Sequence, residues 1–84
     1  MSEMTVIVGK SYSQGMVWLR DNHKKHKLDP QKCRITTRAD VLKGLQNYSI
    51  IWLRGWAATV NSEAIRREVE VARAKGRIKS EITA

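Results

Sequence analysis

The stretch Thr5-Val6-Ile7-Val8-Gly9-Lys10-Ser11 decides the fold class of this chain. Its apolar residues stand at consecutive positions, as in a strand that is buried on both faces of a parallel sheet. Gly9 ends the run, and Ser11 followed by Gln14 has the spacing of a helix capping box. We therefore predict a strand over residues 4–8 and a helix over residues 12–25, which together form the first unit of an α/β sheet.

A second stretch, Ser49-Ile50-Ile51-Trp52-Leu53-Arg54-Gly55-Trp56, repeats this plan. Its apolar run predicts another strand buried on both faces, over residues 49–53, and both runs end near a glycine with a cation beside it. After a loop over residues 57–61, we predict a long helix over residues 62–75 that is capped by Gly76. The core stripe of this helix is predicted to comprise Ala64, Ile65, Val69 and Ala72.

Two short segments have the features of edge strands. Residues 33–36 are few and flanked by charge, and residues 77–82 alternate charged and apolar side chains. Between the first of these and the second central strand, Thr37 and Asp40 again have capping spacing. They predict a short helix that ends near residues 44–47, with a core side made of Ala39, Leu42 and Leu45.

The first helix carries a glycine near its start, which is unusual in a helix. Gly15 costs about 1 kcal/mol of helix propensity relative to alanine, so it indicates that the helix backbone lies close to the sheet or to a ligand. The apolar spacing of this helix predicts an inner stripe of Tyr12, Met16, Leu19 and His23.

The order of elements predicts one three-layer α/β domain over residues 1–84, because a chain of 84 residues holds little more than one domain. We expect a mostly parallel sheet of about four strands in the order 2-1-3-4, with helices on both faces. This order puts a topological switch point between the first and third strands, where such sheets bind ligands outside their carboxyl ends. The residues predicted to converge there as a ligand-binding site are Lys10, Ser11, Ser13, Arg54, Trp56, Thr59 and Asn61.

The chemistry of that site is predicted to be the binding of an anion. Gly9-Lys10-Ser11 lacks the spacing of a Walker A loop, because Met4 stands where its first glycine belongs. The amino end of the first helix beside Lys10 still favours an anion. Trp56 is a candidate for stacking on a base or on a partner protein, with packing in the core as the alternative.

Charge gives the strongest signal in the composition. The chain carries 16 Lys and Arg against 8 Asp and Glu, a formal net charge of +8, which favours nucleic acid or a phosphorylated ligand as a partner. The cations gather between residues 20 and 38, against only Asp21 and Asp29. The residues predicted to bind nucleic acid are Arg20, Lys24, Lys25, Lys27, Lys32, Arg34 and Arg38.

Other features of the sequence restrict the class of protein. No apolar run approaches the roughly 20 residues of a membrane helix, and the first residues do not have the pattern of a signal peptide. The single cysteine, Cys33, is expected to be a reduced thiol in a strand. His23 and His26 lack a supporting ligand at a suitable spacing, so we expect no metal and no cofactor. We expect a cytoplasmic protein.

The segment from Ser49 to Gly76 resembles the nucleoside 2-deoxyribosyltransferase-like family. Gly55-Trp56 matches the loop of that family, and the following helix carries matching residues at Ser62, Glu68, Ala72 and Gly76. The resemblance covers about a third of the chain and implies that Glu68 is a catalytic carboxylate. In size and layout the whole chain is also similar to small uncharacterised α/β proteins of bacteriophages.

These observations support one leading hypothesis and two alternatives. The leading hypothesis is a small basic binding module for nucleic acid or a nucleotide, of the kind that serves as a phage accessory protein and forms a homo-oligomer. One alternative is a minimal nucleotide-processing enzyme of the deoxyribosyltransferase type that uses Glu68. The other is a protein-interaction or inhibitor module whose Trp56 binds a host protein.

Overall fold

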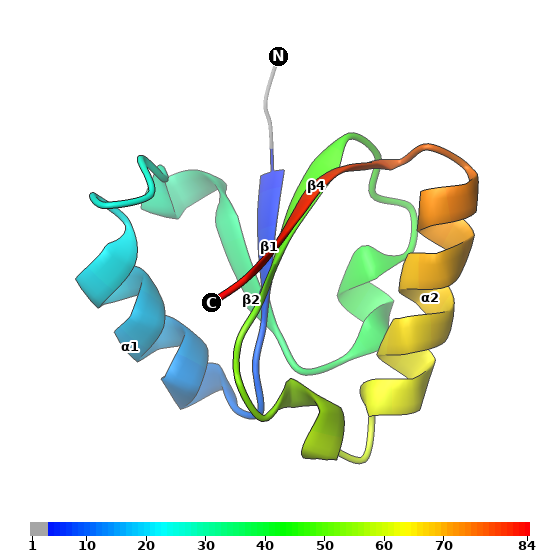
Figure 1. Ribbon diagram of the computed structural model, residues 1–84, viewed down its shortest axis with the longest axis horizontal. Coiled ribbons are helices and arrows are strands. Elements are labelled where there is room, and N and C mark those ends of the chain that lie inside the picture. Colours follow the sequence, from blue (N-terminus) through cyan, green and yellow to red (C-terminus); the bar gives the residue numbers. More distant parts are fainter. Residues whose placement is uncertain (1–3) are drawn as a thin grey trace.

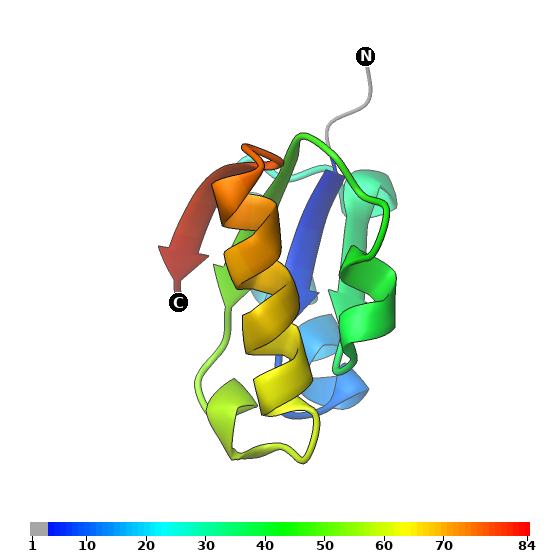
Figure 2. The same ribbon diagram turned by 90° about the vertical axis from the view of Figure 1, so that its right-hand side faces the viewer.

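Four parallel strands form a sheet that lies between two helices, and this confirms the predicted fold class (Figure 1, Figure 2). The computed structural model describes residues 4–84. The strands are β1 (Met4–Val8), β2 (Cys33–Thr36), β3 (Tyr48–Trp52) and β4 (Ile78–Thr83), in the sheet order β2-β1-β3-β4. The helices are α1 (Tyr12–Asn22) and α2 (Ser62–Ala74), and short 3₁₀ turns cover Pro30–Lys32, Ala39–Leu42 and Trp56–Ala58.

The two central strands are buried on both faces, as their consecutive apolar residues predict. Strand β1 pairs in parallel with β2 and with β3, so that Val8 lies between Thr36 and Trp52. Val6 and Val8 belong to the core beneath α2, whereas Ile7 belongs to the core beneath α1. Because successive side chains of a strand point to opposite faces, an unbroken apolar run fills both cores at once.

The amino half of α1 lies against β2 through a glycine. A Cβ atom built on Gly15 would lie 2.3 Å from Cγ2 of Ile35, so only glycine fits this position without displacing the strand residue. Gly15 and Leu19 are the buried residues of this helix. The prediction from Gly15 is confirmed, but the predicted inner stripe is wrong at Tyr12 and Met16, which are 62% and 49% exposed.

Helix α1 ends at Asn22, whereas the sequence predicts an end at residue 25. Side chains at the end of the helix bind carbonyl groups of its last turn: Asn22 Nδ2 donates to Trp18 O, and Nδ1 of His23 lies 3.0 Å from Leu19 O and 3.2 Å from Arg20 O. The chain then turns through Lys27, which has a positive φ of 56°, and Leu28 N donates to His23 O. These contacts end the helix two turns before Pro30.

The predicted short helix after β2 is a single 3₁₀ turn, Ala39–Leu42, and Thr37 is not its cap. The hydroxyl of Thr36 takes the local hydrogen bonds instead, because it accepts from Arg38 N at 2.9 Å and donates to Arg38 O. Ala39 and Leu42 do pack in the core as predicted. In α2 the core stripe is Ile65, Val69 and Ala72, whereas Ala64, predicted to join them, is exposed.

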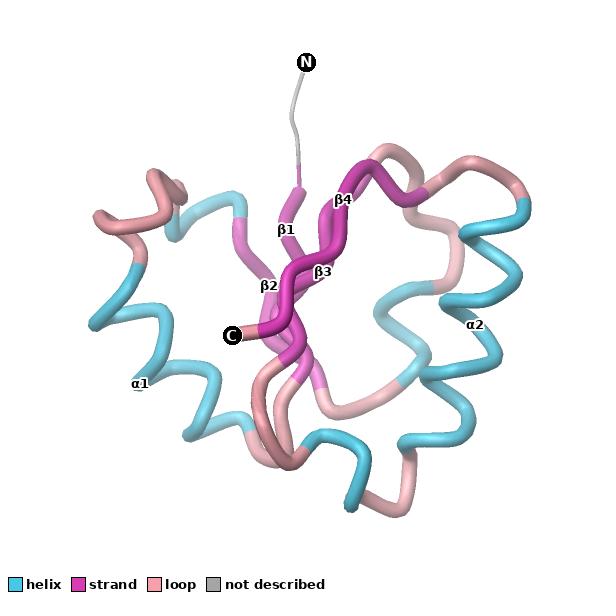
Figure 3. The backbone as a smooth tube through the Cα atoms, in the orientation of Figure 1, coloured by secondary structure: helices cyan, strands magenta, loops and turns pink. Residues whose placement is uncertain are grey.

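The parallel order places the connecting segments at two opposite edges of the sheet. Both helices begin at the carboxyl edge, where β1 and β3 end, and both end at the amino edge (Figure 1, Figure 3). The segment of residues 23–32 connects α1 to β2 and therefore lies at the amino edge, as predicted. Among residues 4–84, no helix is long and apolar enough to cross a membrane.

Candidate functional site

An open crevice of about 770 Å³ lies at the switch point between the loops that follow β1 and β3. Its walls come from the start of α1, the segment after β2 and the loop that leads into α2. The residues that line it are Lys10, Ser11, Thr37, Gly55, Ala58, Thr59, Val60 and Asn61. The fold thus brings together Lys10, Ser11, Thr59 and Asn61, which the sequence predicts for this place.

Gln14 joins the two loops that form the crevice. Its Oε1 accepts a hydrogen bond from Lys10 N at 2.8 Å, and its Nε2 donates to Arg54 O at 2.8 Å. Its backbone N–H donates to Ser11 Oγ at 3.1 Å, which is the cap that the sequence predicts. One side chain therefore fixes the loop after β1 against the loop after β3. The capping motif predicts Gln14 in α1, but not its bond to a loop 40 residues away.

Replacing Gln14 with alanine is expected to lower the free energy of unfolding by about 1–2 kcal/mol, because Lys10 N and Arg54 O lose their partner. The variant Gln14→Glu keeps the acceptor and lacks the donor, so we expect it to lie between alanine and the wild type. Urea unfolding followed by circular dichroism measures both. Equal stability of all three proteins would show that the side chain does not hold the loops together.

The crevice offers donors and a cation. Lys10 is exposed, and its aliphatic chain lies over Gly55, where a Cβ atom would be 3.3 Å from Lys10 Cδ. Gly55 also has a φ of 91°, so both its conformation and this contact favour glycine. Asn61 precedes α2, and its side chain makes no capping hydrogen bond with residues 4–84. Within the described chain, the residues that line the crevice include no Asp or Glu.

The other residues predicted for this site lie around it. Ser13 lines a neighbouring groove along α1 that also contains Lys10 and Ser11. Arg54 is exposed in the loop after β3, and its backbone carbonyl accepts the hydrogen bond from Gln14, whereas its side chain does not line the crevice. Trp56 is half-buried against the α2-side core and belongs to a different cavity.

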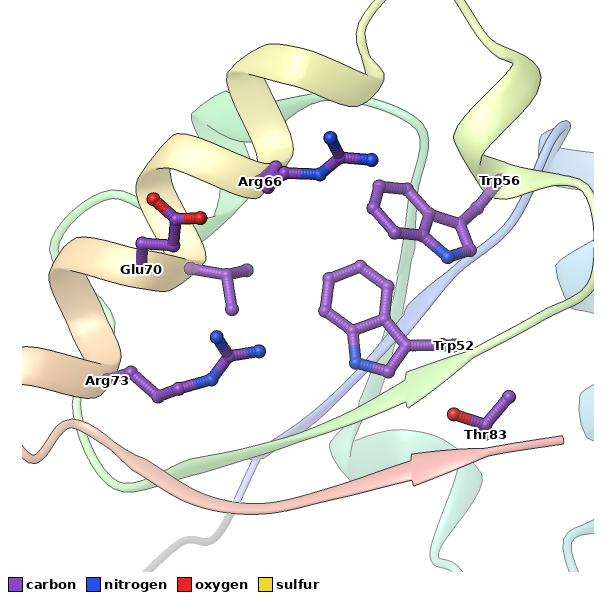
Figure 4. Close-up of a pocket in the computed structure, with 7 residues that line it drawn as sticks. Trp52, Trp56, Arg66, Glu70, Arg73 and Thr83 are labelled. Atoms are coloured by element: carbon purple, nitrogen blue, oxygen red, sulfur yellow. The ribbon is translucent and has the colours of Figure 1, made fainter.

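This second cavity, which we call the tryptophan pocket, has a volume of about 340 Å³ and lies between α2 and the ends of β3 and β4 (Figure 4). The indoles of Trp52 and Trp56 form one wall, with their ring centres 4.4 Å apart and their planes tilted by 36°. The full lining is Trp52, Trp56, Arg66, Val69, Glu70, Arg73 and Thr83. Apart from Trp56, the sequence does not predict these residues as site residues.

Glu81 connects two lining residues of the tryptophan pocket, Arg73 and Trp52, by hydrogen bonds. Both Nε and one terminal nitrogen of Arg73 donate to Glu81 at 2.7 Å, and Trp52 Nε1 donates to the same carboxylate at 3.1 Å. The hydrogen bonds from Arg73 lower the pKa of Glu81 below its usual range, and the bond from Trp52 acts in the same direction. Glu81 therefore stays ionised and neutralises Arg73.

The cations predicted to bind nucleic acid do not form one patch. Lys24, Lys25, Lys27 and Lys32 lie at the amino edge, on or next to the segment between α1 and β2. Arg38 follows β2 and therefore lies at the carboxyl edge, on the same edge as the crevice. The remaining two are exposed on α1 and on the edge strand β2: Arg20, which pairs with Asp21 at 3.2 Å, and Arg34.

Glu68, which the family resemblance implies as a catalytic carboxylate, is half-buried on α2. It lines neither the crevice nor the tryptophan pocket. Its charge acts instead on Tyr48, whose pKa is raised mainly by burial; Arg77 opposes the increase, and the carboxylates of Glu68 and Glu81 add to it. The fold thus does not bring Glu68 together with the predicted ligand-binding residues.

No protein-family model, curated protein or solved structure matches the chain.

Proposed function

We propose that this protein is a small basic module that binds nucleic acid or a nucleotide, and that the crevice at the switch point holds a phosphate group. One observation carries the proposal: an ammonium group, hydroxyls and a carboxamide line one crevice without a carboxylate. They belong to Lys10, Ser11, Thr37 and Asn61, whereas the hydroxyl of Thr59, which also lines the crevice, donates to Trp56 O at 2.9 Å. Such donors match the acceptor oxygens of a phosphate, and hydrogen bonds to an ionised group are about twice as strong as neutral ones.

The ends of the helices support an anion at the same place. Helices α1 and α2 both start at the carboxyl edge, so their N-terminal N–H groups and dipoles favour negative charge there. Gln14 holds the two loops in position before a ligand arrives. A site that is already formed spends less free energy on ordering when it binds.

The net charge of +8 supports an anionic partner as large as a nucleic acid. Lys24, Lys25 and Lys27 supply a second cationic region at the amino edge that can contact the backbone of a long nucleic acid. Contacts of this kind depend on the phosphates and are independent of sequence, so binding weakens steeply as the salt concentration rises.

The test compares oligonucleotide binding by the wild type and by the double variant Lys10→Ala, Asn61→Ala. We expect the double variant to fold, because the side chain of Lys10 is exposed and that of Asn61 makes no cap bond in the described chain. Each lost charge-assisted contact is worth about 1.5–3 kcal/mol, so we expect the affinity for a fluorescein-labelled single strand to fall about tenfold or more. Fluorescence anisotropy at low salt measures it.

Two control variants make the test specific for the crevice. Arg67→Gln removes the same amount of charge from an exposed position of α2 outside both cavities, and Glu68→Gln removes the carboxylate of the alternative enzyme; both are expected to bind as the wild type does. An equal loss of affinity in Arg67→Gln would show that only net charge matters. Absence of binding to single strands, duplexes and RNA at low salt would contradict the proposal outright.

A further inference from the structure

The tryptophan pocket has the construction of a binding site for a flat ligand. Its aromatic wall is made by Trp52 at the end of β3 and by Trp56 in the turn that follows (Figure 4). Opposite this wall, α2 contributes the long side chains of Arg66 and Arg73. The volume of about 340 Å³ is at the lower end of the range of small-molecule pockets, so the pocket suits one ring system with a small substituent.

The inner part of the pocket is fixed and electrically neutral. Trp52 is 8% exposed and is held by its hydrogen bond to Glu81. The same carboxylate receives two hydrogen bonds from Arg73, which leaves little of that positive charge for a ligand. The indole of Trp52 is therefore fixed in its orientation.

Arg66 is the cation of the pocket that remains available. Its guanidinium lies 5.9 Å from the ring centre of Trp56, in a cation–π contact. Within residues 4–84 no carboxylate forms an ion pair with it, although Glu70 stands one helical turn further along α2. The side chain is exposed, so it can leave the indole without breaking an ion pair.

We propose that the tryptophan pocket binds a nucleobase, and that Arg66 binds the phosphate attached to the same nucleotide. The base stacks on the indole of Trp56, next to the buried ring of Trp52, where planar ring systems gain from contact with an aromatic face. The guanidinium of Arg66 then turns from Trp56 to the phosphate, which it can meet with paired hydrogen bonds. The neutral Arg73–Glu81 pair bounds the site without repelling or attracting the base.

This site and the crevice share no lining residue, so either can bind without the other. The nucleotide can come from two sources, a free mononucleotide or one unit of a single strand. Both present the same base and phosphate, and separate titrations with AMP and with a short oligo(dA) distinguish them.

Isothermal titration calorimetry with AMP, adenosine and oligo(dA) tests the proposal on the wild type and three variants. Trp56→Leu removes the stacking face and keeps an apolar side chain, while Arg66→Gln removes the charge. Arg67→Gln is the control, because this neighbouring residue lies outside the pocket and is exposed in a pair with Glu63. Circular dichroism establishes that each variant is folded.

We expect AMP or oligo(dA) to bind the wild type, with adenosine weaker than AMP. Trp56→Leu should weaken binding of every base-containing probe about fivefold or more, the loss associated with one stacked base. Arg66→Gln should reduce the affinity for AMP to that for adenosine, and Arg67→Gln should change neither. The proposal is overturned if none of the probes binds, or if binding survives Trp56→Leu and Arg66→Gln unchanged while Lys10→Ala abolishes it, since the ligand would then occupy only the crevice.

Discussion

Replacing Gly15 with valine is expected to lower the free energy of unfolding by about 3 kcal/mol. The first carbon of the new side chain would lie 2.3 Å from Cγ2 of Ile35, closer than two carbon atoms can approach. Helix α1 would have to move away from β2, which opens the core around Leu19 and Ile7. Thermal and urea unfolding followed by far-ultraviolet circular dichroism measure the loss.

Two further variants separate the steric effect from helix propensity. Ser13→Val places the same side chain on the exposed face of α1 and should cost only a few tenths of a kcal/mol. Combining Gly15→Val with Ile35→Ala removes Cγ2 and Cγ1 of Ile35, the two atoms nearest to the new side chain. The double variant should therefore be more stable than the sum of the single effects predicts. If Gly15→Val unfolds like Ser13→Val, α1 does not approach β2 as closely as described.

The central part of the fold could be predicted from the sequence because the signal is strong and local. The runs around Ile7 and Ile51 are apolar at consecutive positions, and only strands covered on both sides by helices use such runs in a small α/β domain. Adjacent central strands then leave the short segments 33–36 and 77–82 at the edges. The sheet order and the position of the crevice follow from this arrangement.

The orientation of α1 could not be predicted by apolar spacing. A stripe through Tyr12 and Met16 maximises the apolar area on one face, but in the structure the helix is rotated so that Gly15 contacts Ile35. Close contact between the helix backbone at Gly15 and the side chain of Ile35 outweighs burial of two large side chains here. The glycine is the sequence signal for this rotation, and a stripe centred on Gly15 and Leu19 would have given the correct face.

The tryptophan pocket could be predicted only in part, because its residues come from segments far apart in the chain. Trp56 stands out after Gly55, but Arg66 and Arg73 resemble ordinary solvated cations on the exposed side of a helix. Their position against Trp52 depends on how α2 packs across β3 and β4. The crevice was easier to predict, since the ends of adjacent parallel strands meet at one edge wherever the helices lie.

Replacing Trp52 with alanine is expected to destabilise the protein by about 3–5 kcal/mol, the usual cost of removing a buried aromatic side chain. Trp52 pairs with Val8 across the sheet, packs against Trp56 and donates a hydrogen bond to Glu81. A small domain has a total stability of about 5–15 kcal/mol, so this single change should remove a large share of it. Denaturant unfolding and near-ultraviolet circular dichroism follow it.

Two further variants, Trp56→Ala and Trp52→Phe, test whether the two tryptophans contribute differently to stability. Trp56 is half-buried, and its indole Nε1 donates no hydrogen bond among the described residues, so removal of its side chain should cost clearly less than that of Trp52. Phenylalanine at position 52 keeps most of the packing but leaves Glu81 with Arg73 as its donor, and the expected cost is about 1–2 kcal/mol. Equal losses of unfolding free energy in Trp52→Ala and Trp56→Ala would contradict the prediction that Trp52 contributes more to the stability of the fold. The expected order makes Trp56 the residue that a ligand can use without loss of the fold, since Trp52 supports the core while Trp56 presents its ring at the surface.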